Sequence, residues 1–192
     1  GLDMVKFYYM NKKIPEKQFV LGVGIDDVSI NQAVEIVKQW LTGKGKHFIA
    51  TPNPEFIMAA QSDLEFKNIL NKADLAIPDG AGLKLSGKIK NITTGIDLME
   101  NLCRLAGELG FTTGFLGGKK GVAKKATECL QKKYPGLKVA FAEDGPEIDK
   151  DGSVIARNEV TRQSNTEDRH SAEWRITMTE KVDLLFVGFG QV

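Results

Sequence analysis

The sequence has few cysteines, few histidines and no long apolar run, and each shortage excludes a class of protein. Its 192 residues include two cysteines and two histidines, which are too few for a scaffold stapled by disulfides. Cys103 and Cys129 have no histidine beside them, so the pattern favours a reducing compartment over a zinc site or a redox pair. The longest apolar run lies near Leu184 to Phe189, far short of the roughly 18 residues that cross a bilayer. We therefore expect a cytoplasmic protein without a transmembrane helix.

The charges of the chain nearly cancel. It carries 26 basic and 25 acidic side chains, for a net charge of +1. Such a balance gives no overall attraction to nucleic acid, and we expect no nucleic-acid partner. Hydrophobic residues make up 42% of the chain and charged residues 27%, which is typical of a soluble globular protein.

The two ends of the chain differ from its middle. Residues 1–18 are polar and basic, and we expect an N-terminal arm or the remnant of a tag, because Gly1 begins no signal-peptide pattern. Residues 19–192 are predicted to form a single core domain. The chain stops at Val192, just after an apolar strand and without the helix that follows each earlier strand. This pattern predicts a core that lacks a C-terminal appendage.

Short apolar stretches alternate with amphipathic segments along the core. Periodicity and turn residues predict strands at 19–25, 47–51, 74–78, 113–116, 137–142 and 182–188, and helices at 30–41, 55–61, 63–72, 96–109 and 121–134. Capping boxes at Ser29 and Ser62 predict where two of the helices begin. Continuous apolar strands between such helices are typical of a parallel sheet covered on both faces. We predict an α/β protein with a Rossmann-like open, mostly parallel sheet and helices on both faces.

Ligands of open parallel sheets bind beyond the carboxyl ends of the strands, so the residues that follow each strand are candidates for a site. The second predicted strand ends in Thr51 and Asn53, on a loop stiffened by prolines. Asn53 could hold a substrate or simply cap the next helix. The third strand ends in Asp79, followed by Gly80 and Gly82, which let another group approach the backbone closely. The spacing leaves open whether Asp79 is a general base or a helix cap.

Glycine-rich turns follow two further strands. Gly117, Gly118 and Lys119 open a predicted helix, whose N-terminal N–H groups suit a phosphate. Gly188 and Gln191 repeat this pattern at the end of the last strand. The spacing matches neither the Walker motif nor the dinucleotide fingerprint, so these turns indicate phosphate binding less strongly than those motifs would.

Two other chemistries are not supported by the sequence. Asp149 and Asp151 could hold a divalent ion, but the glycine after them favours an exposed turn, and we predict no metal. His47 and His170 have no serine or cysteine elbow nearby, so a hydrolase triad is not indicated.

Five motifs of the chain occur in the order known from one enzyme family. They are Thr51-Pro52-Asn53-Pro54-Glu55, Pro78-Asp79-Gly80-Ala81-Gly82, Thr94-Gly95-Ile96-Asp97-Leu98, Phe115-Leu116-Gly117-Gly118-Lys119 and Asp183-Leu184-Leu185-Phe186-Val187-Gly188-Phe189-Gly190. The chain resembles the WecG/TagA/CpsF glycosyltransferases, and within them the branch that transfers N-acetylmannosamine during wall teichoic acid synthesis.

The resemblance implies a reaction and its partners. It implies an inverting transfer of N-acetylmannosamine from its UDP donor to the C4 hydroxyl of GlcNAc on undecaprenyl diphosphate, without a metal or other cofactor. It also implies a peripheral position at the cytoplasmic face of the cell membrane, whose surface the full-length protein contacts. Whether the chain forms a homo-oligomer stays open.

The resemblance also implies roles for residues at the strand ends. Asp79 would be the catalytic base, and Thr51, Asn53 and Gln191 would bind substrate. The nucleotide and its phosphates would lie against Gly117, Gly118, Lys119 and Gly188.

The chain departs from the family pattern at two places. The family usually has an arginine before the Thr-Gly-x-Asp motif, where this chain has Ile92 and Thr93. Residues 156–181 are longer and more polar than the family's helix, and the C-terminal appendage is absent. We therefore expect a folded chain with weak or no activity. A nucleotide-binding module without catalysis, and a transferase of another UDP-sugar, remain alternatives.

Overall fold

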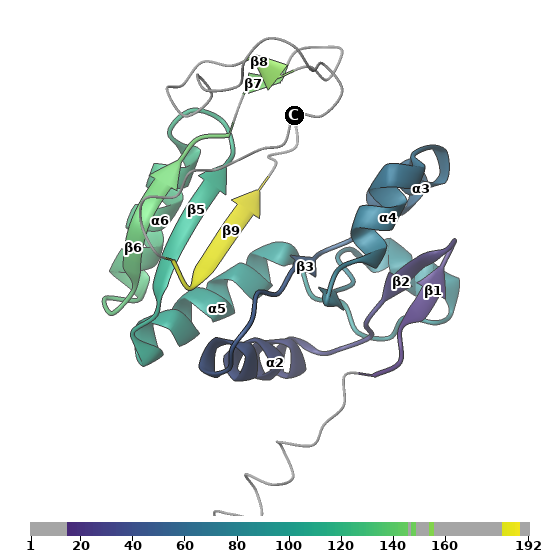
Figure 1. Cartoon of the computed structure of the whole chain (residues 1–192), viewed down its shortest axis with the longest axis horizontal. Helices are drawn as coiled ribbons and strands as arrows, with labels where there is room; N and C mark the ends of the chain where they lie inside the picture. Colours follow the sequence, from purple (N-terminus) through teal and green to yellow (C-terminus); the bar gives the residue numbers. More distant parts are fainter. Residues whose placement is uncertain (1–14, 146, 149–153, 156–181, 189–192) are drawn as a thin grey trace, which may run out of the picture. The chain divides into compact units, whose positions relative to one another are not determined.

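The computed structural model describes residues 15–145, 147–148, 154–155 and 182–188 (Figure 1). The chain divides into two compact units, Gly1–Leu102 and Cys103–Val192. The predicted single core domain stays a prediction.

The first unit opens with a β-hairpin. Strand β1 (Gln18–Val20) pairs antiparallel with β2 (Val23–Ile25), and the turn between them is formed by Leu21 at φ 49° and Gly22 at φ 81°. Two central residues with positive φ form the hairpin turn that matches the twist of its strands. The single strand expected over 19–25 was therefore wrong, because this two-residue turn divides the apolar run in the middle.

Amide side chains from two helices hold this hairpin turn. Gln61 of α3 (Pro54–Ser62) donates from Nε2 to the Leu21 carbonyl oxygen at 3.1 Å. Asn71 of α4 (Leu64–Asn71) donates from Nδ2 to the Gly22 carbonyl oxygen at 3.0 Å and accepts from the Gly24 amide at 2.8 Å. The turn therefore depends on partners about 40 to 50 residues further along the chain.

The helices of the first unit begin at side-chain caps. Helix α2 (Ile30–Thr42) has the predicted capping box at Ser29. The box predicted at Ser62 was wrong, because Asp63 caps α4 instead, with Oδ1 accepting from the Phe66 amide at 2.8 Å.

Parallel pairing places the strand ends of the first unit side by side. Strand β3 (Ile49–Ala50) pairs with β4 (Leu75–Ala76), and backbone bonds continue beyond both strands, from the Ile77 amide to the Ala50 oxygen at 2.8 Å. A 3₁₀-helix, η1 (Ala81–Ser86), follows. The core between these elements contains Val23, Ile25, Ala50, Ile57, Leu70, Ala76, Leu83 and Ile89.

The second unit contains a three-stranded parallel sheet. Strand β5 (Thr112–Gly117) lies in the centre, between β6 (Lys138–Glu143) and β9 (Leu184–Gly188). Helix α6 (Val122–Lys133) connects β5 to β6, and α5 (Gly95–Leu109) precedes β5 and spans the boundary between the units. Strands β7 (Glu147–Ile148) and β8 (Val154–Ile155) form a separate antiparallel pair. The predicted Rossmann-like, mostly parallel α/β fold is confirmed.

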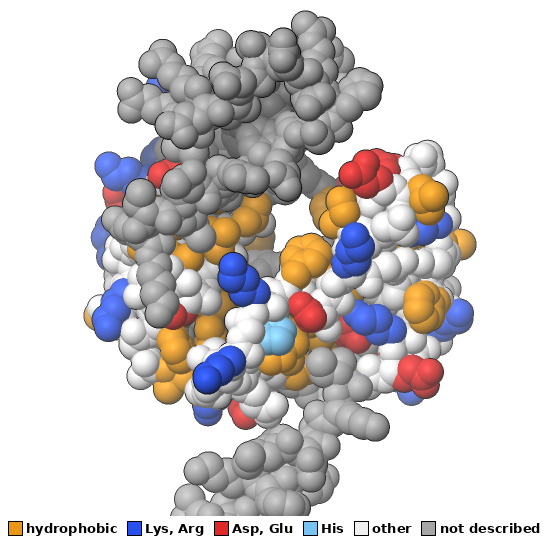
Figure 2. Space-filling model, in the orientation of Figure 1, with side chains coloured by type: hydrophobic (Ala, Val, Ile, Leu, Met, Phe, Trp, Pro, Cys, Tyr) orange, Lys and Arg blue, Asp and Glu red, His pale blue; other side chains and the backbone are white. Residues whose placement is uncertain are grey.

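The surface and the thiols add three observations. On the face shown in Figure 2, basic and acidic side chains are interspersed.

In the part of the chain that the structure describes, no helix combines the length and apolar character needed to cross a bilayer. Cys103 in α5 is buried, whereas Cys129 in α6 is exposed.

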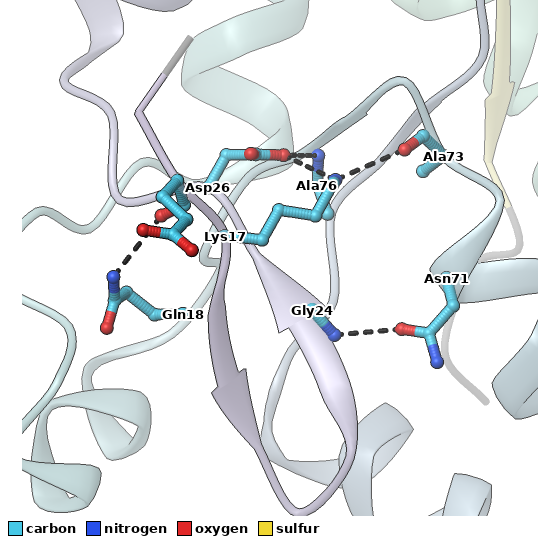
Figure 3. Close-up of polar contacts among 8 residues, drawn as sticks. Lys17, Gln18, Gly24, Asp26, Asn71, Ala73 and Ala76 are labelled. Atoms are coloured by element: carbon cyan, nitrogen blue, oxygen red, sulfur yellow. Dashed lines mark hydrogen bonds and ion pairs between the residues drawn. The ribbon is translucent and has the colours of Figure 1, made fainter.

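An ion pair with one fully buried partner joins Lys17 to the strands of the first unit (Figure 3). Asp26 follows β2 and is fully buried, and its Oδ2 accepts from Lys17 Nζ and from the Ala76 amide, both at 2.7 Å. The Asp26 amide donates in turn to the Ala76 carbonyl oxygen at 2.8 Å, and Lys17 also donates to the Ala73 carbonyl oxygen at 3.2 Å. Because an uncompensated buried charge is costly, we expect the loss of either Lys17 or Asp26 to destabilise the first unit.

Replacing Asp26 by asparagine tests this pair. The Asp26→Asn variant can keep an oxygen in the place of Oδ2, where both donors bond, but it removes the charge that compensates Lys17, so we expect the free energy of unfolding to fall by about 3 kcal/mol. Urea unfolding followed by circular dichroism measures the loss. The matched control is Asp27→Asn, because Asp27 is a partly exposed carboxylate without an ion pair among the described residues, and its Oδ1 accepts from the backbone amides of Lys90 and Asn91. It should cost about 1 kcal/mol, and equal losses in both variants would contradict the expectation.

Candidate functional site

Asp79 is fixed at the carboxyl end of β4. Its amide donates to the Pro52 carbonyl oxygen at 3.0 Å, which extends the pairing of the two strands up to the acid itself. Its carboxylate Oδ2 accepts from the amide of Gly95, the first residue of α5, at 3.1 Å. Oδ1 accepts no hydrogen bond from the residues that the structure describes. Asp79 therefore caps a helix with one oxygen and leaves the other for a further partner.

Thr51 lies against the same helix start. A Cβ built on Gly95 would stand 3.3 Å from Thr51 Oγ1 and 3.5 Å from Asp79 Oδ2. The glycine thus lets a hydroxyl and a carboxylate from two neighbouring strand ends approach the first turn of α5. Among the described residues, the Thr51 hydroxyl has no hydrogen-bond partner. The sequence placed these two side chains at strand ends, and the structure brings them together.

Asn53 caps the next helix, as one of its two interpretations expected. Its Oδ1 accepts from the Phe56 amide at 2.8 Å, at the first turn of α3. The Asn53 amide group has no partner among the described residues, so a role in substrate binding stays a prediction.

The two glycines after Asp79 leave room for Pro54, the first residue of α3. A Cβ on Gly82 would stand 2.9 Å from Pro54 Cγ, and one on Gly80 would stand 3.2 Å from Pro54 Cδ. Gly80 also has φ +98°, which glycine adopts without strain. The group expected to approach this backbone closely is therefore Pro54 of the chain itself.

A further pair of residues shapes this site, and sequence reasoning gave it no role. Thr94 Oγ1 donates to Asp97 Oδ2 at 2.7 Å and accepts from the Asp97 amide at 3.1 Å. This reciprocal cap closes the first turn of α5, just before the Gly95 amide that Asp79 accepts from. The Thr-x-x-Asp spacing is a capping signal that could have predicted it.

The second unit brings the two glycine turns together. A Cβ on Gly117 would collide with the Gly188 carbonyl oxygen, and the Gly118 amide donates to that oxygen at 3.0 Å. Strand β5 is connected through α6 to β6 on one side and pairs with β9 on the other, so the glycines stand where the connections diverge. Such a switch point is where open α/β sheets bind ligands. Lys119 is exposed after these glycines.

Not every residue considered from the sequence falls within the described ranges. Gln191, Asp149 and Asp151 lie outside the described residues. Within the described ranges, no group of three or more His, Cys, Asp or Glu side chains gathers as metal ligands would. Asp79, Thr51 and Gly95 belong to the first unit, and Gly117, Gly118 and Gly188 belong to the second.

Asp79 and Thr51, at the start of α5, are placed as proton transfer from a bound hydroxyl would require. A general base needs a carboxylate held within hydrogen-bond reach of its substrate, on a rigid element. Asp79 has a fixed backbone, one anchored oxygen and one oxygen without a partner among the described residues. Thr51 adds a hydroxyl that can donate to or accept from the same substrate.

Comparison with known proteins gives one family. Residues 18–191 match the model of the "Glycosyl transferase WecG/TagA/CpsF family". A relative from Staphylococcus aureus (strain MRSA252), named N-acetylglucosaminyldiphosphoundecaprenol N-acetyl-beta-D-mannosaminyltransferase, is 30% identical over 149 residues, covering 73% of this chain and 58% of the relative. The relative of the same name from strain NCTC 8325 / PS 47 is 30% identical over 146 residues, covering 72% and 57%. The chain thus matches little more than half of the length of these relatives.

Replacing Gly117 by alanine tests the junction of β5 and β9. The methyl group would meet the Gly188 carbonyl, and φ +126° would strain any residue with a Cβ. The control is Gly121→Ala, where φ is +77° but nothing lies within 4 Å of the added Cβ. We expect Gly117→Ala to lower the free energy of unfolding by about 1–3 kcal/mol more than Gly121→Ala does. If urea unfolding showed a smaller or reversed difference in unfolding free energy between the two variants, the ends of β5 and β9 would not need this close contact.

Proposed function

The chain belongs to the WecG/TagA/CpsF family of glycosyltransferases, and from this premise we propose that it takes part in building a lipid-linked disaccharide. In this proposal, N-acetylmannosamine passes from UDP-N-acetylmannosamine to the C4 hydroxyl of GlcNAc on undecaprenyl diphosphate, in the linkage unit of wall teichoic acid. The names of the Staphylococcus aureus relatives support this donor sugar and this acceptor. Because the acceptor is a membrane lipid, the reaction would take place at the cytoplasmic face of the cell membrane.

The observation that carries the proposal is the placement of Asp79 and Thr51 around Gly95. The acceptor hydroxyl would donate its proton to Asp79 Oδ1 while its oxygen attacks the anomeric carbon of the donor sugar. The new bond from oxygen to carbon forms as the bond from the anomeric carbon to the diphosphate breaks, with inversion, and UDP leaves. Asp79 holds the proton, and the Thr51 hydroxyl orients the acceptor or the sugar.

The remaining predicted residues would bind the donor. Gly117, Gly118, Lys119 and Gly188 would hold the nucleotide diphosphate, and Asn53 and Gln191 would contact the sugars. No metal enters this proposal, so negative charge on the leaving diphosphate has to be met by backbone N–H groups and cations such as Lys119. Turnover that persists in EDTA would support this part of the proposal.

One observation favours a second candidate function, a nucleotide-binding module without catalysis. The Asp79 carboxylate accepts from the Gly95 amide, and Asn53 likewise caps a helix. If capping were the whole role of Asp79, the motifs would serve the fold and the glycine turns alone would bind a nucleotide.

The Asp79→Asn variant separates the two functions. Asparagine can still accept from the Gly95 amide, so the fold should persist, but it cannot take a proton at neutral pH. We expect the rate of UDP release, with UDP-N-acetylmannosamine and a short-lipid GlcNAc diphosphate acceptor, to fall at least about 100-fold. The assay is run on the protein that carries this chain.

The matched control for Asp79→Asn is Asp97→Asn. Asp97 belongs to the same helix start, and its asparagine variant can still accept from the Thr94 hydroxyl. We expect it to keep most of the rate. An Asp79→Asn variant that turns over as fast as this control would overturn the role of Asp79 as the catalytic base. Binding of UDP without any acceptor-dependent turnover would favour the binding module.

A further inference from the structure

Asp144 follows β6 at the carboxyl edge of the parallel sheet in the second unit. The preceding elements are β5, a glycine-rich turn and α6, and β6 is the direct neighbour of β5 in the sheet. A strand, a glycine turn, a helix and a second strand that ends in an acid form the half of the Rossmann fold that binds a mononucleotide. In that arrangement, the acid at the second strand accepts from ribose hydroxyls.

Backbone contacts hold Asp144 against the glycine turn. Its Oδ1 accepts from the amide of Gly121, the residue that caps α6, at 2.8 Å. The next residue, Gly145, donates its amide to the Gly118 carbonyl oxygen at 3.2 Å, and a Cβ there would stand 3.2 Å from Gly117 Cα. The acid therefore stands beside the turn that is proposed to hold the nucleotide.

The carboxylate has capacity left for a ligand. The side chain is half-buried, and its Oδ2 accepts no hydrogen bond from the described residues. An anion at this spot repels a phosphate, whereas a pair of neighbouring hydroxyl groups can donate to it. The N-terminus of α6 favours a negative charge, and the Asp144 carboxylate already supplies one there.

We infer that Asp144 recognises the ribose of the nucleotide donor, with Oδ2 accepting from its 2′ and 3′ hydroxyl groups, an inference that rests on the proposed use of a UDP-sugar. The geometry then orders the ligand along the edge of the sheet. The ribose lies at the end of β6, and the diphosphate lies toward the junction of Gly117 with Gly188. Asp144 is thus a residue that selects ribonucleotides over deoxyribonucleotides.

Calorimetric titration of the chain with UDP and with 2′-deoxy-UDP tests the inference without any acceptor. The unmodified chain should bind UDP at least about 10-fold more tightly, since a hydrogen bond to a charged group contributes about 1.5–3 kcal/mol. In Asp144→Asn, an amide oxygen can still accept from Gly121, but the charge is lost. We expect the affinity for UDP to fall about 10-fold, and that for 2′-deoxy-UDP, which offers Oδ2 only its 3′ hydroxyl, to fall by a smaller factor.

A matched control is available at the opposite edge of the same sheet. Asp183 Oδ2 accepts from the Thr112 amide at 2.8 Å, the same kind of bond from a carboxylate that lies before β9. Asp183→Asn should leave both affinities unchanged. A chain that binds UDP and 2′-deoxy-UDP equally, or an Asp144→Asn variant that weakens both equally, would overturn the ribose role alone. A chain that binds no uridine nucleotide would overturn the proposed function and this inference with it.

Discussion

The buried carboxylate of Asp26 is the interaction on which the first unit depends. Its Oδ2 pairs with Lys17 and accepts from the Ala76 amide, while the backbone amide of Asp26 donates to the Ala76 carbonyl oxygen. Three residues later, the same strand delivers Asp79, whose position follows from how β4 is held. A charge with no solvent exposure has to be paired, so the N-terminal segment at Lys17 is part of the structure that positions the candidate base.

Around that base, most side chains have a structural role in addition to any chemical one. Asp79 caps α5, Asn53 caps α3, and Gly80 and Gly82 make room for Pro54. A rigid setting of this kind suits a catalytic group, because it fixes one carboxylate oxygen while the other stays available. The structure thus gives Asp79 both of the roles that its spacing left open, a helix cap that is observed and a base that is proposed.

The sequence predicted the alternation of strands and helices and put Thr51 and Asp79 at strand ends, because both depend on periodicity, but it did not predict that the two side chains meet at Gly95. It failed at the hairpin, because Leu21 at positive φ leaves no sequence signal and glycine alone does not mark a turn. Periodicity alone gave no contact between Gly117 and Gly188, which are 71 positions apart in the chain, although the family resemblance assigned both to one nucleotide site. Asp144 had no signal of its own, since an acid near a turn is ordinary until the strand order β6-β5-β9 places it beside the glycines.

The contrast between the two thiols has a practical consequence. Cys103 is shielded inside α5, whereas Cys129 is exposed on α6, the helix whose cap bonds to Asp144. Among the described residues, a thiol-reactive dye would therefore attach at Cys129 without any engineered cysteine. A fluorophore there would sit on the helix that links the two strands of the proposed nucleotide site, and its emission could follow ligand binding in real time.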